Sequence, residues 1–461
     1  MQRKNSVLPI YLWYTCLFFL ILLLTACASV GSEKQDQNVS TLIYATLSGR
    51  VNRELVDRFN AEHSGDVQIE VVDYSEGIDE GGHQGMDRLV TEIAAGKCPD
   101  IMEMFTYTTN YTGKINALPY QMLAKRGYLE DLWPYIENDP ELGRTSILEA
   151  PLKAAEVDGG LYMLFNRFSI QTVAGPIEVV GDQYSWNLDE LRDAFSTMPG
   201  DATVLDYCTR KSDVFLTLFP MLVDSYIDWE GGQCFFDGEG FRSSLEFINS
   251  FPLELEWTSD EAINRELCER QMNGLQMLNT FGITRARGMQ EIDAWCGGRA
   301  GFVGYPTADG SVGSFFSIES ERLAMSANCK NKDAAWDFLR KMLLPQYVSA
   351  EGIRIEESNY MFPVNQTDFR KHFEHEQSIS YKAPVYAGLG SPIYDFPPME
   401  EADYDRLMDF INRIDKLGIY NQKLLDIIAE PCEAYFSGDK SLDETVALIQ
   451  NRVTLYVNEQ K

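Results

Sequence analysis

Aromatic side chains interleaved with hydroxyls and amides are the residues of this chain best suited to chemistry. The densest group is the segment 105–111, which contains three aromatic rings, three threonines and one asparagine. Rings pack against apolar faces, while hydroxyls and amides hydrogen-bond to polar edges. A sugar, whose C–H faces are bordered by hydroxyl groups, suits such a set of side chains. The alternative is a loop that packs on its own domain, because loops also bury rings.

Eight residues are candidates for a ligand site because of their type and their place in the chain. They follow expected strands, lie near an expected crossing between domains, or are rings that stand near polar residues. These candidates are Tyr74, Tyr107, Asn110, Tyr111, Asn166, Trp229, Trp257 and Tyr305. Each has a structural alternative, as a ring in the core or as an amide that completes a turn. Trp186 precedes a capped helix, and we expect it to act as a hydrophobic staple.

Motifs for enzymatic catalysis are missing from the sequence: it has no Gly-x-Ser-x-Gly elbow, no His-Glu-x-x-His helix and no Gly-x-x-x-x-Gly-Lys loop. The chain has 70 carboxylates, so two of them could be placed for glycoside hydrolysis. That reaction depends on the distance between the two carboxyl groups in space, which the sequence does not give, so this alternative stays open. His372 and His375, with Glu374 and Glu376 beside them, could share a helix face and bind a metal. We expect a solvated charged face at these residues instead of a metal site. For the protein as a whole, we expect no enzymatic activity, no metal and no cofactor.

The N-terminus has the layout of a bacterial signal peptide. Two cations, Arg3 and Lys4, precede an apolar run over 17–24, which ends in Leu-Thr-Ala-Cys. This ending resembles a lipobox, so we expect residues 1–26 to be removed and Cys27 to carry a lipid anchor. An uncleaved membrane anchor over about residues 8–26 is the alternative. Residues 27–40 then form a flexible tether, and the body lies on the extracellular face of the cell membrane.

The composition of the chain further limits the partners and the cysteine chemistry that we expect. The chain has 461 residues, of which 45% are hydrophobic, and its formal net charge of -31 argues against nucleic acid as a partner. Once residues 1–26 and Cys27 are set aside, seven cysteines remain, an odd number. We expect buried thiols, since Cys behaves as a small apolar residue. A bridge between Cys208 and Cys234, or between Cys268 and Cys296, stays open.

The periodicity of the first hundred residues of the body predicts a parallel α/β sheet. Strands are expected at 42–46, 67–71 and 99–104, with helices between them, the second of which ends at Gly96. Ligands collect at the carboxyl ends of such strands, here 48–50, 74–76 and 105–111.

Capping residues predict further helices after Asn187, Asn331 and Ser441. The last of these helices has an apolar stripe that we expect in the core: Leu442, Val446, Ile449, Val453 and Tyr456. Trp336, inside the helix after Asn331, is also expected in the core.

Six short motifs in a fixed order resemble landmarks of one protein family. They are AGKCPDI (95–101), GYLEDL (127–132), DGGLY (158–162), GYP (304–306), KNKDAAW (330–336) and FPVN (362–365). Together with the lipobox-like segment, they resemble the bacterial extracellular solute-binding proteins of ABC importers, in particular the carbohydrate-type group that includes maltose-binding protein. The motifs are spread over the body of the chain, and the sequence between them diverges from that of the family.

The resemblance implies a two-lobed α/β fold of the periplasmic-binding-protein type (type II), with a hinge and an interlobe cleft. Lobe I would comprise 41–165 plus 303–350, and lobe II 166–302 plus 351–461. By analogy, the chain crosses between lobes near 165–170, 302–305 and 349–353.

The function implied is a lipoprotein that captures an extracellular solute, expected to be an oligosaccharide, in the interlobe cleft and delivers it to the permease subunits of an ABC importer. We expect a monomer. Two alternatives stay open: a surface-anchored glycoside hydrolase, and a receptor for another solute such as a peptide, because a fold does not determine its ligand.

Overall fold

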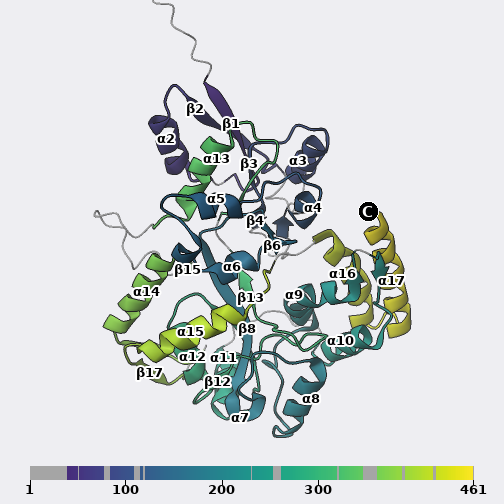
Figure 1. Cartoon of the computed structure of the whole chain (residues 1–461). Helices are drawn as coiled ribbons and strands as arrows, with labels where there is room; N and C mark the ends of the chain where they lie inside the picture. The colour runs from purple at the N-terminus through teal and green to yellow at the C-terminus, as the bar shows by residue number, and fades with distance from the viewer. Residues whose placement is uncertain are drawn as a thin grey trace, which may run out of the picture. The chain divides into compact units, whose positions relative to one another are not determined.

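The computed structural model describes residues 39–49, 51–76, 84–107, 115–117, 120–229, 231–252, 261–318, 321–345, 361–386, 390–418 and 422–459 (Figure 1). The chain divides into a smaller unit, which includes Asn52–Glu70 and the described residues up to Leu42, and a larger unit of Ile43–Val51 and Val71–Lys461. The expected signal peptide, the lipid anchor at Cys27 and most of the tether lie outside the described residues. The tether was expected to extend to residue 40, but strand β1 already begins at Ser40.

The smaller unit is organised by helix α2 (Arg53–Glu62). The side chain of Asn52 caps this helix, because its Oδ1 accepts from the backbone N–H of Leu55 at 3.1 Å. Within the unit, Asn60 Oδ1 accepts from the backbone N–H of Ile69 at 2.7 Å, and Asn60 Nδ2 donates to the Ile69 carbonyl at 3.1 Å. The helix is thereby joined to strand β2 (Val67–Asp73) by a side chain rather than by packing alone.

The predicted parallel sheet is confirmed for its central pair. Strand β1 (Ser40–Thr46) pairs in parallel with β3 (Ile101–Glu103), with Tyr44 opposite Ile101, and the order across the sheet is β14-β3-β1-β2. Strand β14 (Leu323–Met325) pairs antiparallel with β3 and was not predicted, since it lies more than 200 residues farther along the chain. Helix α3 (Gln84–Ala94) ends before Gly96, whose φ of 78° is a left-handed conformation that glycine adopts without strain.

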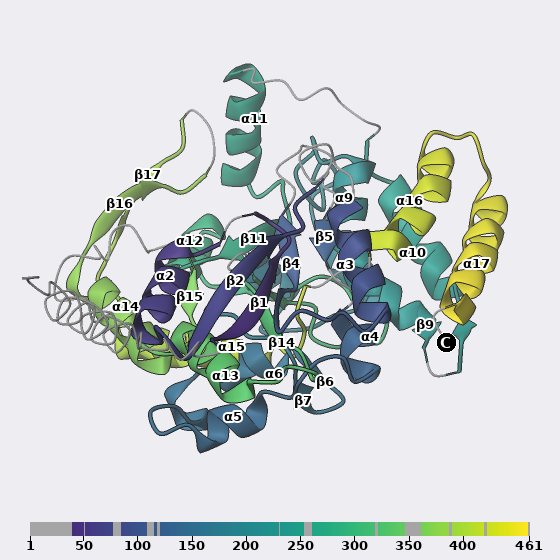
Figure 2. The ribbon, with the colours of Figure 1, turned by 90° about the horizontal axis from the view of Figure 1, so that it is seen from above.

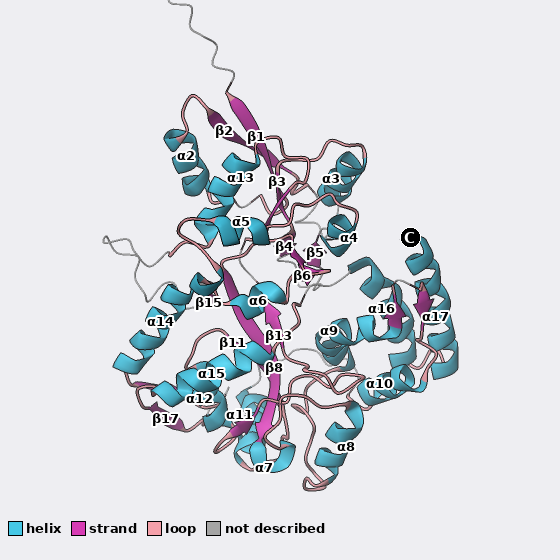
Figure 3. Cartoon of the chain, in the orientation of Figure 1, coloured by secondary structure: helices cyan, strands magenta, loops and turns pink. Residues whose placement is uncertain are grey.

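A second sheet forms around the long strand β8 (Arg167–Pro176), seen in magenta in Figure 3. Four strands pair with it, all antiparallel: β11 (Asn279–Ile283), β12 (Ala300–Gly301), β13 (Phe315–Ser317) and β15 (Phe362–Pro363). Most of β8 is buried, so both of its faces are covered. Of the three expected crossings, 165–170 leads into β8 and 302–305 follows β12, while 349–353 lies outside the described residues.

Helices pack on this second sheet and form an apolar core with it. The capping box at Asn187 is confirmed at the start of α8 (Leu188–Ser196), and Ser441 with Glu444 begins α17 (Leu442–Glu459) in the same way. The predicted stripe of α17 is confirmed as core, with Leu442 partly buried at its edge. Helix α16 (Gln422–Phe436) lies beside α17 in both Figure 1 and Figure 2.

The other elements of the described chain connect and cover these parts. They are β4 (Phe105–Tyr107), β5 (Ile115–Ala117), α4 (Tyr120–Lys125), α5 (Trp133–Asn138), η2 (Arg144–Ser146), α6 (Glu149–Lys153), β6 (Glu156–Val157), β7 (Gly160–Leu161), α7 (Ile177–Val180), α9 (Lys211–Leu222), η3 (Val223–Tyr226), β9 (Ile227–Asp228), β10 (Gln233–Cys234), α10 (Glu239–Asn249), α11 (Glu261–Met272), α12 (Gly288–Trp295), α13 (Lys332–Leu339), η4 (Arg340–Met342), α14 (Gln366–Ser378), β16 (Tyr381–Pro384), β17 (Ile393–Phe396) and α15 (Glu401–Arg413).

The seven cysteines of the body are not bonded to one another in the structure, and Cys234, Cys268, Cys329 and Cys432 are buried. The bridges between Cys208 and Cys234 and between Cys268 and Cys296 that the sequence left open are therefore not formed here. In the part of the chain that the structure describes, no helix combines the length and the apolar character needed to cross a lipid bilayer.

Candidate functional site

A pocket of about 180 Å³ opens in the larger unit beside the second sheet. A cavity of about 150 Å³ holds a molecule of benzene, so this pocket has room for one six-membered ring. Its walls come from β8, β11, the first turns of α9, single residues of α8 and α10, and the connecting segments that contain residues 204–209, 278 and 305–306. The lining residues are Val173, Leu191, Val204, Leu205, Thr209, Asp213, Val214, Thr217, Phe247, Leu278, Asn279, Thr280, Tyr305 and Pro306.

The apolar part of the pocket is an extension of the core. Val173 lines it from β8 and Leu278 from the residue just before β11, and Val214 and Phe247 belong to the same buried cluster. Such a wall gives an apolar surface that a ring can cover, and water leaves it favourably.

Three polar side chains of the lining make no hydrogen bond within the described part of the chain: those of Thr209, Asn279 and Thr280. Together they offer two hydroxyls and one amide, each able both to donate and to accept. The hydroxyl of Thr217, in contrast, donates to the Asp213 carbonyl at 2.7 Å. The pocket therefore combines an apolar wall with polar groups that a ligand can satisfy.

The charged group of the pocket is Asp213, and it is paired. Arg210 Nε donates to Oδ2 and Arg210 Nη2 donates to Oδ1, both at 2.9 Å, so the guanidinium and the carboxylate form a two-pronged pair. The backbone N–H of Arg210 also donates to Oδ2 at 3.3 Å. Asp213 lies in the first turn of α9, where a carboxylate interacts favourably with the helix dipole.

A second set of polar groups lies where the strands of the first sheet end. Glu103, at the end of β3, is only 4% exposed, and its Oε2 accepts from Thr46 Oγ1 at 2.7 Å, Leu47 N at 2.8 Å, Ser48 N at 3.0 Å and Ser48 Oγ at 3.1 Å. The backbone N–H of Tyr74 donates to the Thr46 carbonyl at 2.8 Å. The ends of β1 and β2 and the end of β3 are thus joined by hydrogen bonds, and the expectation that a ligand binds at these strand ends stays a prediction.

Another carboxylate lies close to Glu103. Glu321 accepts a hydrogen bond from the Tyr44 hydroxyl. Burial, and the negative charge of Glu103 in addition, raise the pKa of Glu321 above its usual range. Burial and the same two carboxylates raise the pKa of Tyr44. A pair of buried carboxylates at a strand end costs stability, and groups with shifted pKa values of this kind gather at functional sites.

The ligand-binding residues proposed from the sequence lie in different parts of the structure. Tyr305 lines the pocket, with its ring against Phe315 at a centroid distance of 5.8 Å. Tyr74 is buried at the strand ends, where its hydroxyl donates to Glu92 at 2.6 Å and the guanidinium of Arg88 lies over its ring. Burial and the bond to Glu92 raise the pKa of Tyr74 to about 12.

The other candidates are not among the residues that line the pocket. The Asn166 carbonyl accepts from the backbone N–H of Val364 at 2.9 Å, and Trp229 packs against the core. The backbone of Tyr107 pairs with Ile115 in β4 and β5. The Tyr107 side chain and Asn110, Tyr111 and Trp257 lie outside the described residues, so their role in binding stays a prediction.

Sequence reasoning missed the polar residues of the pocket and Glu103. Asp213 follows Arg210 by three positions at a helix start, which is a capping spacing that can be recognised in the sequence. Glu103 is a carboxylate within the apolar stretch 101–105, and a charge in a buried strand is a signal that it has specific partners. Nothing local distinguishes Asn279.

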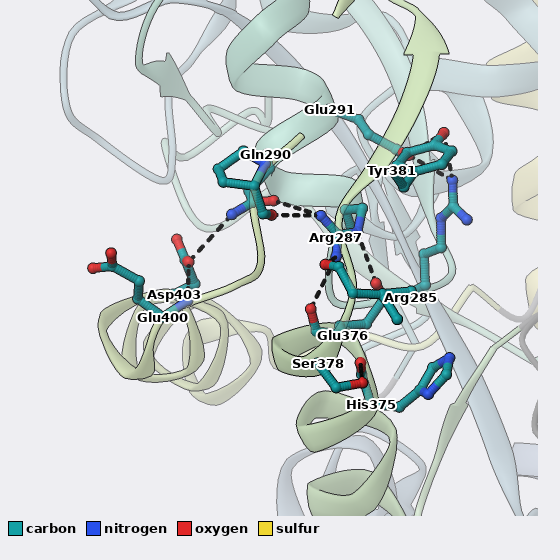
Figure 4. Close-up of polar contacts among 12 residues, drawn as sticks. Arg285, Arg287, Gln290, Glu291, His375, Glu376, Ser378, Tyr381, Glu400 and Asp403 are labelled. Atoms are coloured by element: carbon teal, nitrogen blue, oxygen red, sulfur yellow. Dashed lines mark hydrogen bonds and ion pairs between the residues drawn. The ribbon is translucent and has the colours of Figure 1, made fainter. Parts of the chain in front are cut away.

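The two histidines of α14 belong to a structural region. The neighbouring Glu376 was expected on a solvated face, but it is buried and accepts from Arg287 Nε at 2.7 Å (Figure 4). Arg287 also donates to the carbonyls of Glu376, Ile379 and Pro397. The expectation was wrong for Glu376 because its partner Arg287, the residue just before α12, is far away in sequence. Among the described residues, no group of three possible ligands could hold a metal ion.

Comparison with known proteins reveals likeness in structure alone. No protein-family model matches the chain, and no curated protein matches it in sequence. An extracellular solute-binding protein of family 1 from Alicyclobacillus acidocaldarius is 14% identical, with 91% of this chain and 98% of that chain covered and a TM-score of 0.46.

Two further solved structures are similar. A sugar-binding protein from Xanthomonas citri is 14% identical, with 91% of this chain and 98% of that chain covered and a TM-score of 0.46. The cyclic α-maltosyl-1,6-maltose binding protein of Arthrobacter globiformis is 15% identical, with 91% and 100% covered and a TM-score of 0.47. The structures that align with this chain include many solute-binding proteins, most of them named for a sugar.

Proposed function

We propose that the chain is the solute-binding component of an ABC importer, and that the solute it captures is a sugar. The pocket beside β8 and β11 carries this proposal: it has the volume of one ring, an apolar wall, and the polar side chains of Thr209, Asn279 and Thr280, which have no partner among the described residues. A pyranose ring needs both kinds of surface. The ordered family motifs in the sequence, and the names of the similar solved structures, agree with this assignment.

The proposal keeps the finer expectations from the sequence. Cys27 would carry the lipid anchor on the extracellular face of the membrane, and the lobes would comprise 41–165 plus 303–350, and 166–302 plus 351–461. In an oligosaccharide, one ring would occupy the pocket and the remaining rings would extend beyond it. Delivery to a permease requires that the sugar be held and released unchanged.

The glycoside hydrolase alternative needs two carboxyl groups about 5 to 10 Å apart, one on each side of the bond that breaks. Among the described residues that line the pocket, Asp213 is the only carboxylate, and both of its oxygens are bonded to Arg210. The pocket as described therefore favours binding over hydrolysis. A peptide receptor remains the alternative that a ligand screen must test.

The test is a thermal-shift screen of the full chain, purified in detergent, against mono- and oligosaccharides, short peptides and amino acids. A ligand that binds only the folded state raises the melting temperature. We expect a saturable shift with a sugar that is recovered intact. Asn279→Ala should weaken that shift, whereas Asn328→Ala, a change of another asparagine outside the pocket, should leave it unchanged. A shift with peptides alone would refute the sugar, and cleaved sugar would refute the transport role.

A further inference from the structure

Trp186 makes hydrogen bonds to both ends of the segment 304–307, which contributes to the wall of the pocket. Its indole Nε1 donates to the Gly304 carbonyl at 2.8 Å, and its own backbone carbonyl accepts from the backbone N–H of Thr307 at 3.0 Å. Tyr305, which lies between these two bonds, lines the pocket, whereas Trp186 is not one of the lining residues. Trp186 is only 1% exposed, so its indole bond is made inside the protein.

Gly304 is a residue whose backbone needs such a constraint. Its φ of 71° is left-handed, and a Cβ at this position would lie 2.6 Å from the backbone nitrogen of Ser314, so the site requires glycine. Glycine, however, has more backbone freedom than any other residue. The Gly304 N–H donates to the Val173 carbonyl of β8 at 2.9 Å, and the indole of Trp186 holds the carbonyl of the same residue.

The orientation of the Gly304 carbonyl determines where the next side chain points. The peptide unit between Gly304 and Tyr305 is planar, so a bond that fixes this carbonyl also fixes the backbone nitrogen of Tyr305. The Tyr305 ring lies against Phe315 at a centroid distance of 5.8 Å, and the residue is part of the pocket wall. A rotated peptide plane would therefore move the aromatic surface that a sugar ring covers.

We propose that Trp186 is a positioning residue of this pocket, which holds the segment 304–307 in the conformation that places Tyr305 in the wall. The inference rests on the proposed function, since it concerns the same pocket, and it adds a residue that acts on affinity from outside the lining. A protein that has its binding conformation for only a fraction of the time binds with an affinity reduced by that fraction. Trp186 thus acts through the conformation of the free protein.

Trp186→Phe removes the indole N–H and keeps an aromatic ring in the core. The ends of the segment keep other contacts, because the bond from Gly304 to Val173 stays and Thr307 Oγ1 donates to the Ser311 carbonyl at 3.0 Å. Loss of one buried hydrogen bond should leave the binding conformation in about one molecule in ten, so the dissociation constant for a sugar should rise about tenfold.

The matched control is Trp133→Phe. Trp133 is also buried, and its indole Nε1 donates to Glu156 Oε1 at 2.7 Å, but it does not line the pocket and makes no bond to the segment 304–307. This variant loses a similar bond and a similar volume, so it should keep the wild-type dissociation constant.

Calorimetry on the full chain in detergent measures the dissociation constants, with glucose, galactose, mannose and maltose as probes. Circular dichroism confirms that each variant is folded. A second variant carries benzothienyl-alanine at position 186, in which sulfur replaces the indole N–H while the shape of the side chain is kept. It should also bind about tenfold more weakly, and it decides the question if Trp186→Phe does not fold.

A positioning role also has a spectroscopic signature in the wild type. In protein with isotope-labelled tryptophan, the indole N–H resonance of Trp186 is identified by its absence from Trp186→Phe. Addition of a sugar should shift this resonance, because contact with Tyr305 reaches the indole through the Gly304 carbonyl. The indole resonance of Trp133 should stay in place. An indole that only fills the core would not respond to the sugar.

The outcomes distinguish this inference from the proposed function. Sugar binding by the wild type that neither variant at position 186 weakens would overturn the positioning role and leave the proposed function in place. A Trp186 indole resonance that does not move at saturating sugar would overturn it as well. No binding of any of these sugars, or of oligosaccharides that contain them, would overturn the proposed function itself and the inference with it.

Discussion

Glu103→Gln should loosen the loop that follows strand β1. The carboxylate oxygen Oε2 accepts from the backbone amides of Leu47 and Ser48 at 2.8 and 3.0 Å, and from the hydroxyls of Thr46 and Ser48. Glutamine keeps the shape and one acceptor oxygen but removes the charge. A hydrogen bond to a charged acceptor contributes about 1 kcal/mol more than one to a neutral acceptor.

Two backbone amides are affected, so holding the loop closed should become about 2 kcal/mol less favourable. If these amides exchange by local opening, their exchange with solvent deuterium should become about 30-fold faster. Hydrogen–deuterium exchange with mass spectrometry measures this on peptides that span 43–49. Glu103→Met, which offers no oxygen at all, should have a larger effect.

The control is Glu130→Gln. The Glu130 carboxylate accepts from side chains, Lys332 Nζ at 2.7 Å and Tyr135 Oη at 3.0 Å, and no backbone amide of the 46–48 loop contacts it. Its substitution should leave exchange in 43–49 unchanged. Exchange in 43–49 that is as slow in Glu103→Gln as in the wild type would refute the reasoning, because it would mean that Glu103 does not hold this loop.

Three more predictions concern stability, measured by urea denaturation. Burial raises the pKa of Glu321 above its ordinary value of 4.5, so the wild type should lose stability as the pH rises through that raised pKa. Glu321→Gln should therefore be more stable than the wild type at pH 7 and should have no advantage below pH 4. Burial raises the pKa of Asp139, but the hydrogen bonds from Arg340 outweigh burial, and the pKa lies well below its ordinary value of 3.8. Asp139→Asn should lower the free energy of unfolding by about 3 kcal/mol at pH 7, and this difference from the wild type should shrink as the pH falls below 3.8. Arg287→Met should cost about 3 to 5 kcal/mol at pH 7, because Glu376 stays buried without its partner, and Glu376→Gln in the same chain should recover part of that loss.

Helix caps and tight turns, whose conformation depends on neighbouring residues, were predicted well from the sequence. The capping box at Asn187 appears as expected, with Oδ1 accepting from the backbone N–H of Glu190 at 3.0 Å and Glu190 Oε2 accepting from that of Asn187 at 2.7 Å. The motif DGGLY forms a tight turn between β6 and β7, in which Asp158 and Gly159 both have positive φ, 51° and 83°. Here neighbouring residues decide the conformation, so the sequence pattern is sufficient.

The helix after Asn331 shows the limit of a periodic pattern. Its cap is confirmed, since Asn331 Oδ1 accepts from the backbone N–H of Ala334 at 3.2 Å, and Trp336 is buried as expected. The apolar spacing continues to Leu343, but the α-helix ends at Leu339 and a tighter turn, η4, follows. There Arg340 bonds to Asp139 with its guanidinium, a contact between residues 201 positions apart.

The candidate site was predicted only in part for the same reason. Tyr305 lines the pocket and is also a buried member of the core, and Trp229 packs against the same core, so the binding role expected for each ring stays a prediction. Whether an aromatic ring faces a ligand or the core depends on the elements that pack around it, and the ring itself is the same in both cases. Asp213 and Asn279 lie in one pocket although 66 positions separate them in the sequence, and no spacing rule connects them.

Local patterns in the sequence were enough to predict the α/β class of the fold, the helix caps and a parallel sheet. These follow from interactions over a few residues, or from the rule that alternating strands and helices build a parallel sheet. The tertiary structure alone decided that β14 joins β3, that Arg287 meets Glu376, and which side chains line the pocket. Those features come from contacts between distant segments, whose energies depend on packing in three dimensions rather than on neighbours along the chain.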